Sequence, residues 1–232
     1  WQRAVAAGGR VTHNRVLAET VVEIDYAVTL LTVHTDGPRG PALQFCEPIG
    51  HRQVDGGVLE SWQPQQMSEP ALGAAKSVAA RMVRALGGRG VFGVEVLVRG
   101  DEVYFSDVSV RPHDSGLVTL RTQRLSEFEL HARAVLGLPV DTIMISPGAT
   151  AVWYSGAESA DEAPGPLEDQ PEAAGVLAAV LAGPGSDVRV FGSHEGSARR
   201  RLGLALATAP DVTAARDRVR QASTALRKLW HP

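Results

Sequence analysis

The chain has 232 residues, a formal net charge of −3 and 44% hydrophobic residues, which suffices for one large domain or two small ones. Its slightly acidic balance, with a pI of about 6.2, offers no electrostatic footprint for nucleic acid or for an anionic membrane. No apolar run reaches the roughly 18 residues of a membrane span, and the single cysteine, Cys46, excludes an internal disulfide. A lone cysteine fits a reducing compartment, so we expect a cytoplasmic protein.

Strands are predicted to dominate the first part of the chain. The β-branched run at 15–33 predicts two strands, which a bend near Glu23–Asp25 separates. Two further strands are expected at 43–48 and 58–65, with a turn at Asp55-Gly56-Gly57 between them.

Two helical patterns flank these strands. Residues 1–8 are typical of the end of a helix that stops at Gly8-Gly9, so we interpret the chain as a fragment of something longer. Ser68 is a favourable N-cap for a second helix, which Gly87-Gly88 ends. The apolar face of this helix is predicted to comprise Leu72, Ala75, Ala79, Met82 and Leu86.

The next segment is a predicted β-hairpin with one acid on each strand. Side chains alternate faces along a strand, so the turn decides whether Glu95 and Asp107 share a face. A two-residue Gly100-Asp101 loop pairs Glu95 with Ser106. A loop that also includes Glu102 sets Glu95 opposite Asp107, with Cβ atoms roughly 5 Å apart. We predict the second register.

Two carboxylates placed in this way can share a hard cation such as Mg²⁺, which takes oxygen ligands and keeps waters and phosphates as the rest. Taken alone, the hairpin is better explained by ordinary surface acids. The loop that follows it is packed with Arg111, His113 and Asp114, and this shifts the interpretation towards phosphate chemistry.

The second half of the chain mixes helices and strands. Ser126 is predicted to cap a helix that stops at Gly137. Residues 156–172 are acidic and rich in proline and glycine, as expected of a linker or exposed loop. Beyond them we expect a short helix, strands at 187–191 and 202–208 with a basic loop between them, and a long final helix. Grouped strands followed by mixed elements favour an α+β fold.

Four phrases occur in the order GHRQ…ESWQPQQMS, GVFGVEV, VSVRPHDSG…VTL and RRLGLALAT. They resemble the formate-dependent phosphoribosylglycinamide formyltransferases, a family of ATP-grasp enzymes, over essentially the whole chain. The resemblance implies an ATP-grasp C-terminal domain, with a mixed or antiparallel sheet and flanking helices, plus a small C-terminal α/β subdomain. The implied divisions are a lid remnant at 1–18, an ATP-grasp core with the metal-binding hairpin at 19–150, and a subdomain with the substrate-phosphate loop at 151–232.

The resemblance also implies a reaction. ATP phosphorylates formate to formyl phosphate, and the amine of glycinamide ribonucleotide then attacks the formyl carbon. ATP and Mg²⁺ are the implied cofactors, formate and glycinamide ribonucleotide are the implied substrates, and a homodimer is implied for the full-length protein. Phosphoryl transfer leaves side chains mainly the tasks of orienting the reactants and neutralising charge on phosphate oxygens.

The matching motifs assign roles to residues of the hairpin and its loop. By resemblance, Glu95 and Asp107 hold Mg²⁺ between the ATP phosphates. Asp114 matches the acid that grips the amine end of glycinamide ribonucleotide, and Arg111 matches the basic position that meets the transferring phosphate. Outside the family context, Asp114 equally fits a turn acid before Gly116, and Arg111 an ordinary surface arginine.

Two further pairs of residues match substrate positions. Arg200 and Arg201 match the pair that clamps the 5′-phosphate, a task that suits the planar guanidinium fork, although a solvated basic loop is the alternative. Glu19 and Val22 match the positions that meet adenine, but taken alone they are plain strand residues. His51 lies in a matching phrase and is more typical of a structural histidine than of a catalyst.

The sequence departs from the family at three positions. Ala27 stands where the family has an acid that holds the ATP ribose. Loss of this acid is expected to weaken ATP binding unless Glu23 or Asp25 substitutes for it. Asp107 stands where relatives usually have glutamate, and Ser193 where they have lysine beside the substrate phosphate.

The family's N-terminal domain and most of its lid are absent from the chain, which is therefore expected to be inactive alone. In order of preference, the chain belongs to a working formyltransferase, to an ATP-grasp ligase or carboxylase with another substrate, or to a non-catalytic nucleotide-binding paralogue.

Overall fold

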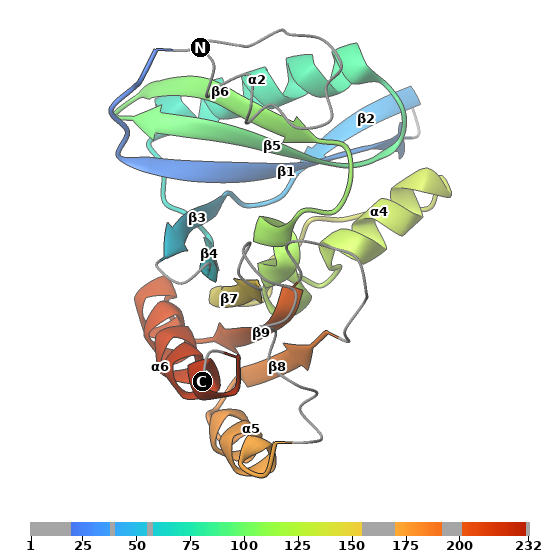
Figure 1. Ribbon diagram of the computed structural model, residues 1–232. Helices are drawn as coiled ribbons and strands as arrows, with labels where there is room; N and C mark the ends of the chain where they lie inside the picture. Colours follow the sequence, from blue (N-terminus) through green and yellow to red (C-terminus); the bar gives the residue numbers. More distant parts are fainter. Residues whose placement is uncertain (1–19, 38–39, 55–57, 155–169, 192–200, 231–232) are drawn as a thin grey trace, which may run out of the picture.

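The computed structural model describes residues 20–37, 40–54, 58–154, 170–191 and 201–230, and its strands form a single sheet (Figure 1). The strands are β1 (Tyr26–Gly37), β2 (Gly40–Phe45), β3 (Ile49–Val54), β4 (Val58–Gln63), β5 (Gly90–Arg99), β6 (Glu102–Ser109), β7 (Gly148–Tyr154), β8 (Ser186–Val190) and β9 (Arg201–Thr208). Their order is β6-β5-β1-β3-β4-β7-β9-β8, and β2 pairs with β1. Every pairing between these described strands is antiparallel.

The helical segments are α2 (Glu69–Leu86), the 3₁₀ turn η1 (Asp114–Val118), α3 (Thr119–Thr122), α4 (Glu127–Val135), α5 (Ala173–Leu181) and α6 (Val212–Trp230). With the antiparallel sheet they confirm the expected α+β architecture. Within the described segments, no helix combines the length and the apolar character needed to cross a bilayer.

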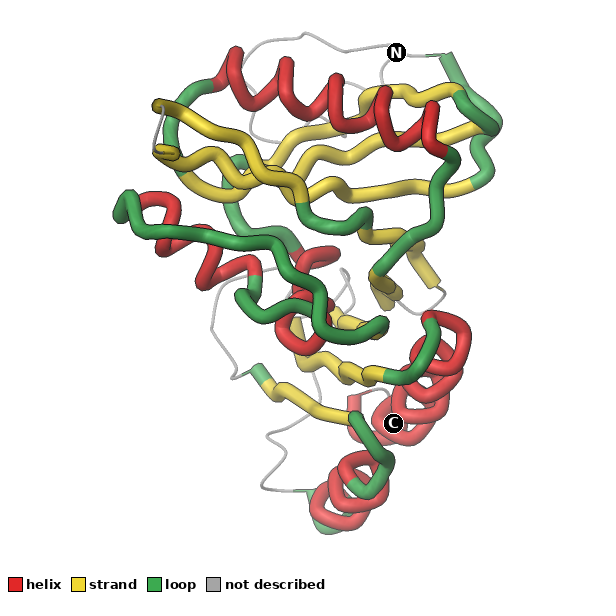
Figure 2. Tube along the Cα trace, turned by 180° about the vertical axis from the view of Figure 1, so that it is seen from behind, coloured by secondary structure: helices red, strands yellow, loops and turns green. Residues whose placement is uncertain are grey.

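Helices cover both faces of the part of the sheet that contains β1 and β5. Figures 1 and 2 view the molecule from opposite sides and show α2 and α4 on opposite faces. Leu30 of β1 packs with α2, whereas Leu31 packs with Leu130 of α4. Because successive side chains of a strand point to opposite faces, these two neighbouring leucines enter different cores.

Helix α2 begins as predicted, because the Ser68 side chain accepts a hydrogen bond from the backbone N–H of Ala71 at 3.2 Å. Its buried side chains are Ala71, Ala75, Ala79 and Val83. The predicted apolar face is therefore wrong in part: Leu72 and Met82 are half-buried, and Leu86 is exposed. Small side chains at four-residue spacing face the sheet, which leaves the longer ones beside the contact.

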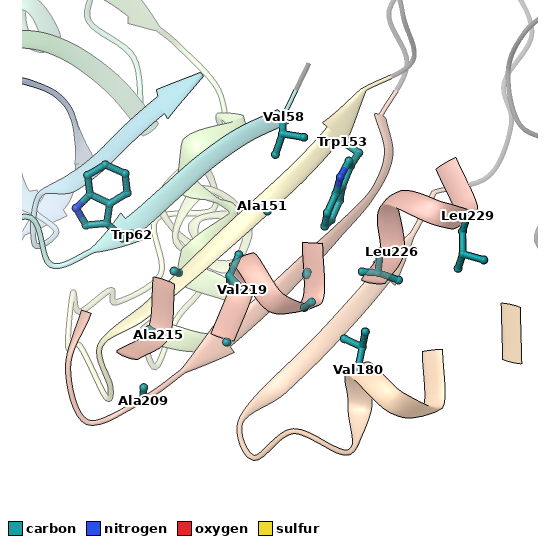
Figure 3. Close-up of a cluster of buried hydrophobic side chains, with 14 of the residues drawn as sticks. Val58, Trp62, Ala151, Trp153, Val180, Ala209, Ala215, Val219, Leu226 and Leu229 are labelled. Atoms are coloured by element: carbon teal, nitrogen blue, oxygen red, sulfur yellow. The ribbon is translucent and has the colours of Figure 1, made fainter. Parts of the chain in front are cut away.

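The other half of the sheet carries a second core. Figure 3 shows Trp62 and Trp153 on the strands and Val219 and Leu226 on α6 within one apolar cluster. Val180 of α5 joins the same cluster. The predicted order of a helix, two strands and a final helix is confirmed by α5, β8, β9 and α6. The predicted linker, apart from residues 170–172, and most of the predicted basic loop lie outside the described residues.

Several elements differ from the sequence prediction. Residues 20–25 lie in no strand, and β1 begins only at Tyr26, whereas the rest of the predicted first strand lies outside the described residues. Two strands, β3 and β7, were not predicted. β7 is buried along its whole length and therefore lacks the alternation that marks a half-exposed strand. It pairs with both β4 and β9, so the sheet continues without a break across residues 150 and 151.

Candidate functional site

The hairpin of β5 and β6 pairs Glu95 with Asp107, as the sequence predicts, but by another route. The turn is the two-residue Gly100-Asp101, so the predicted three-residue loop is wrong. A β-bulge beside Glu95 then places one additional residue, Ser106, in β6 and shifts the register. Without this bulge, Asp107 would point to the opposite face.

The two carboxylates fit a divalent cation. Glu95 has 23% of its side chain exposed, and Asp107 is exposed. Within the described segments, Asp107 has no hydrogen-bond or ion-pair partner, and Glu95 has only His113, whose Nε2 lies 3.5 Å from Glu95 Oε1. No group of three or more His, Cys, Asp or Glu that could hold a metal occurs among these residues. Two carboxylate ligands leave the rest of a coordination shell to waters and phosphates, which Mg²⁺ accepts.

His113 connects this pair to the interior of the site. Its Nδ1 lies 2.9 Å from Ser115 Oγ, which donates a hydrogen bond to Thr29 Oγ1 at 2.8 Å. Thr29 is itself the register partner of Glu95 across β1 and β5. Gly93 leaves room for the histidine, because a Cβ there would lie 3.3 Å from His113 Cβ. The ring is thus held between Glu95 and the buried Ser115 hydroxyl, which Thr29 in turn fixes.

Asp114 opens η1 and connects it to two distant strands. Tyr154, at the end of β7, donates its phenolic O–H to Asp114 Oδ2. Arg201, at the start of β9, has Nη1 at 3.2 Å from Asp114 Oδ1. The Arg201 guanidinium also lies over the Phe191 ring, 5.2 Å from its centroid. The structure therefore brings together Asp114 and Arg201, which the family resemblance assigns to one substrate.

A buried carboxyl group lies against the same loop. Glu127, the first residue of α4, is fully buried, and its Oε2 accepts a hydrogen bond from the backbone N–H of His113 at 2.8 Å. Burial raises the pKa of Glu127 to about 8, and the nearby charge of Asp114 adds to the shift. Sequence analysis missed Glu127 because an acid in the first turn of a helix is an ordinary feature, explained by the helix dipole.

His51 lies on β3, opposite Ala27 of β1. Its Nε2 is buried and has no hydrogen-bond partner among the described residues. Burial lowers the pKa of His51, while Glu95 acts in the opposite direction and His113 adds to the lowering. The interpretation as a structural histidine did not anticipate this proximity to the charged groups of the site.

The remaining candidate residues are placed as follows. Arg111 is exposed, and the described parts of the chain provide no ion-pair partner for it. Val22 is half-buried ahead of β1. Glu19, Arg200 and Ser193 lie outside the described residues.

Ala27, at the position where the family resemblance leads us to expect a ribose-binding acid, has two acidic neighbours in the sequence. Asp25 accepts a hydrogen bond from the backbone N–H of Gly100 at 2.7 Å, so its carboxylate supports the hairpin turn. Glu23 is exposed, and no described residue hydrogen-bonds to it. Of the two proposed substitutes, Glu23 has the uncommitted side chain.

Comparisons with known proteins show the family of this chain. Residues 2–128 match the model of the ATP-grasp domain family, and residues 168–226 match the family described as "PurT, C-terminal". The formate-dependent phosphoribosylglycinamide formyltransferase of Corynebacterium efficiens is 57% identical over 97% of this chain and 54% of its own length. Its counterpart in Rhodococcus jostii is 52% identical over 97% of this chain and 53% of its own length. The chain spans about half the length of the curated relatives it matches.

Solved structures show the same relationship. The glycinamide-RNase-transformylase T of Mycobacterium tuberculosis superposes with a TM-score of 0.75 at 54% identity, over 90% of this chain and 57% of that one. The N5-carboxyaminoimidazole ribonucleotide synthetase of Thermus thermophilus superposes with a TM-score of 0.67 at 26% identity, over 91% of this chain and 52% of that one. The chain belongs to the ATP-grasp family, and formate-dependent phosphoribosylglycinamide formyltransferases are among its close relatives.

Proposed function

We propose that this chain is part of an enzyme that uses ATP and Mg²⁺ to formylate glycinamide ribonucleotide with formate, through formyl phosphate. The observation that carries the proposal is the contact between Asp114, on the loop that follows the hairpin of Glu95 and Asp107, and Arg201 at the start of β9. One region thus offers an acceptor for an amine, a guanidinium for a phosphate and two carboxylates for a cation.

The Asp114–Arg201 ion pair suits a substrate with both an amine and a phosphate. An amine N–H that bonds to Asp114 Oδ1 takes the place of Arg201, while Tyr154 keeps Oδ2 oriented. The guanidinium released in this way can bind phosphate oxygens through its planar fork, together with Arg200. Such a substrate replaces both halves of one internal ion pair, so neither charge is left without a partner.

The residues around the hairpin would serve the nucleotide. Glu95 and Asp107 would hold Mg²⁺, which neutralises charge on the phosphate oxygens when it is bound. Exposed Arg111 would meet the transferring phosphoryl group, while Glu19 and Val22 would contact adenine. Orientation and charge neutralisation are the main contributions that a protein makes to phosphoryl transfer.

The complete activity requires more than this chain contains. Because the chain spans about half the length of its curated relatives, we propose that it is inactive when purified alone. Formylation, the homodimer and the cytoplasmic location are proposed for the full-length protein.

A chimera tests the function. The matching part of the M. tuberculosis relative is replaced with residues 1–232, and ADP release is measured with formate and glycinamide ribonucleotide. We expect ADP release that requires both substrates, and none from the 232-residue chain alone. An Asp114→Asn version of the chimera should lose most of its response to glycinamide ribonucleotide. A chimera that binds Mg²⁺-ATP but shows no dependence on formate contradicts the proposal.

A ligase or carboxylase reaction with another acid substrate is the second candidate. It is favoured by Ala27, which lacks the family's ribose-binding carboxylate, and by Asp107, which is one methylene shorter than glutamate. The same chimera distinguishes this candidate when bicarbonate or acetate replaces formate. Faster ADP release with either acid than with formate would favour it.

A further inference from the structure

Glu127 is a buried acid beside the candidate site for which the proposed reaction has no role. Its Oε2 accepts a hydrogen bond from the backbone N–H of His113 at 2.8 Å, and its own backbone N–H donates to Thr119 Oγ1 at 2.9 Å. Its Oε1 is buried and has no hydrogen-bond partner among the described residues. The side chain therefore crosses from the start of α4 to the loop that contains Asp114.

The loop is wound closely around this carboxyl group. A Cβ at Gly116 would lie 2.2 Å from Glu127 Oε2 and 2.6 Å from Cδ, so only glycine fits against it. The requirement is steric, because Gly116 does not have a positive φ angle. The backbone N–H of Gly116 donates to His113 O at 2.8 Å, which closes the loop over the acid. Residues on both sides of Asp114 are thus held against one side chain.

The direction of Asp114 depends on this arrangement. Its carboxylate has to meet Tyr154 from β7 and Arg201 from β9, two strands that lie far along the chain from η1. No hydrogen bond connects the backbone of Asp114 itself to the sheet among the described residues. The loop is instead fixed at His113, through Glu127, and at Ser115, whose hydroxyl donates to Thr29 Oγ1.

We propose that Glu127 is a positioning residue: its carboxyl group is the template on which residues 113–116 are wound, and it thereby directs Asp114 towards the substrate amine. The identity of that amine rests on the proposed function, whereas the role of Glu127 in shaping the loop does not. A glutamine at this position has the same length and retains an oxygen that accepts from His113. An aspartate keeps the carboxyl group but is one methylene too short to reach His113 from α4.

The test uses Glu127→Gln, Glu127→Asp and, as a matched control in the same helical turn, Glu129→Asp. Among the described residues, the Glu129 carboxylate hydrogen-bonds to Ser126 alone, in the capping box of α4, so its shortening weakens the helix start without touching the loop. Amide hydrogen exchange at His113 is followed by NMR in the 232-residue chain, with the Leu130 amide as an internal reference for α4. Steady-state kinetics are measured on the same three variants of the chimera.

We expect Glu127→Asp to speed exchange at His113 about tenfold and to raise the KM for glycinamide ribonucleotide about tenfold, the ratio expected for one lost buried hydrogen bond. The KM for Mg²⁺-ATP should stay within about threefold, because the hairpin acids are untouched. Glu127→Gln should resemble the native protein in both measurements, and Glu129→Asp should leave His113 exchange unchanged.

Three results would overturn the proposal: unchanged exchange in Glu127→Asp, equal effects of Glu127→Asp and Glu129→Asp, or equal damage from Glu127→Gln and Glu127→Asp. Faster exchange at Leu130 to the same extent as at His113 would show a loss of α4 and would also contradict it. If the chimera with native Glu127 has no activity, the proposed function fails, while hydrogen exchange in the 232-residue chain still decides the role of Glu127.

Discussion

Among the described residues, two glutamates are almost fully buried, and their surroundings shift their pKa values in opposite directions. Glu60 of β4 is 3% exposed and meets Arg52 Nε at 2.6 Å, Arg216 Nε at 3.0 Å and Arg220 Nη2 at 3.2 Å. Burial raises its pKa, but hydrogen bonds from Arg216 and Arg52 outweigh burial and hold the pKa below its ordinary value. The Glu127 carboxyl group accepts one hydrogen bond, from the backbone N–H of His113, and burial raises its pKa to about 8. The number of cationic partners therefore decides which form of a buried carboxyl is stable.

The two sites also differ in what they hold together. Glu60 joins β4 to α6, and Arg216 of this cluster lies 3.7 Å from the centroid of the Trp62 ring. This cluster is on the face of the sheet covered by α6 and contributes to the architecture. Glu127 lies instead against the loop that contains His113 and Asp114, next to the candidate site. The acid with a lowered pKa joins two elements of the fold, whereas the acid with a raised pKa contacts the loop of the candidate site.

The largest expected effect is the loss of the Glu60 carboxylate. Glu60→Leu leaves three guanidinium groups facing one another, of which Arg216 is only 22% exposed. We expect a loss of about 3 kcal/mol in the free energy of unfolding, measured by urea denaturation. Asp217→Ala is the control, because within the described segments Asp217 pairs with Arg220 alone, at the surface, and should contribute less than about 1 kcal/mol. Equal losses in the two variants would remove the distinction between buried and surface pairs.

The second-largest expected effect is a pH dependence of the free energy of unfolding that comes from Glu127. Between its ordinary pKa of 4.5 and the folded value of about 8, the folded chain keeps a proton that the unfolded chain has released. Native stability therefore falls as pH rises through this window, and Glu127→Gln removes that contribution. The stability of Glu127→Gln relative to the native chain should increase by on the order of 3 kcal/mol from pH 5 to pH 8. Parallel stability curves for the two proteins would mean that Glu127 is ionised in the folded chain.

Asp107 extends the comparison to an exposed acid. Since no described residue hydrogen-bonds to it, Asp107→Asn should change the free energy of unfolding by less than about 0.5 kcal/mol. The same change should weaken binding of Mg²⁺-ATP to the chimera about tenfold in isothermal titration. Asp101→Asn in the turn of the same hairpin is the control and should leave this affinity intact. If both variants bind equally well, the hairpin acids do not hold the cation.

The smallest effect concerns the hydrogen bond that orients Asp114. Tyr154→Phe removes the phenolic donor while the Arg201 ion pair remains, so we expect a loss of about 1 kcal/mol in the free energy of unfolding. Tyr104→Phe is the matched control, because Tyr104 donates to exposed Glu102 on β6 and should show no measurable change. A loss as large as that of Glu60→Leu would place Asp114 with the structural acids rather than with those of the site.

Local patterns predicted much of the fold. Ser68 and Ser126 cap α2 and α4 as expected, because capping depends on residues within one helical turn. The order of elements after residue 172 is also as predicted. β3 and β7 were missed because short or fully buried strands show no regular alternation. The face of α2 was predicted in part, since periodicity alone does not show how closely a helix approaches its sheet.

The register of the hairpin could be predicted only in part from the local sequence. Alternation along the strands and the acids Glu95 and Asp107 are properties of the sequence, and the pairing of these acids is confirmed. The predicted three-residue turn was wrong, because a β-bulge at Ser106 sets the register of the two strands. A bulge depends on how two strands fit within a sheet, which the residues of the turn do not specify.

By itself, the sequence determined the α+β class, the helix caps, the position of the acidic hairpin and the motifs that resemble the family. Only the tertiary structure decided that Asp114 meets Tyr154 and Arg201, and that Glu127 lies beneath the same loop. The reason is physical. Capping and strand alternation act between near neighbours, whereas the partners and pKa of a buried carboxyl depend on groups that folding brings together from distant strands.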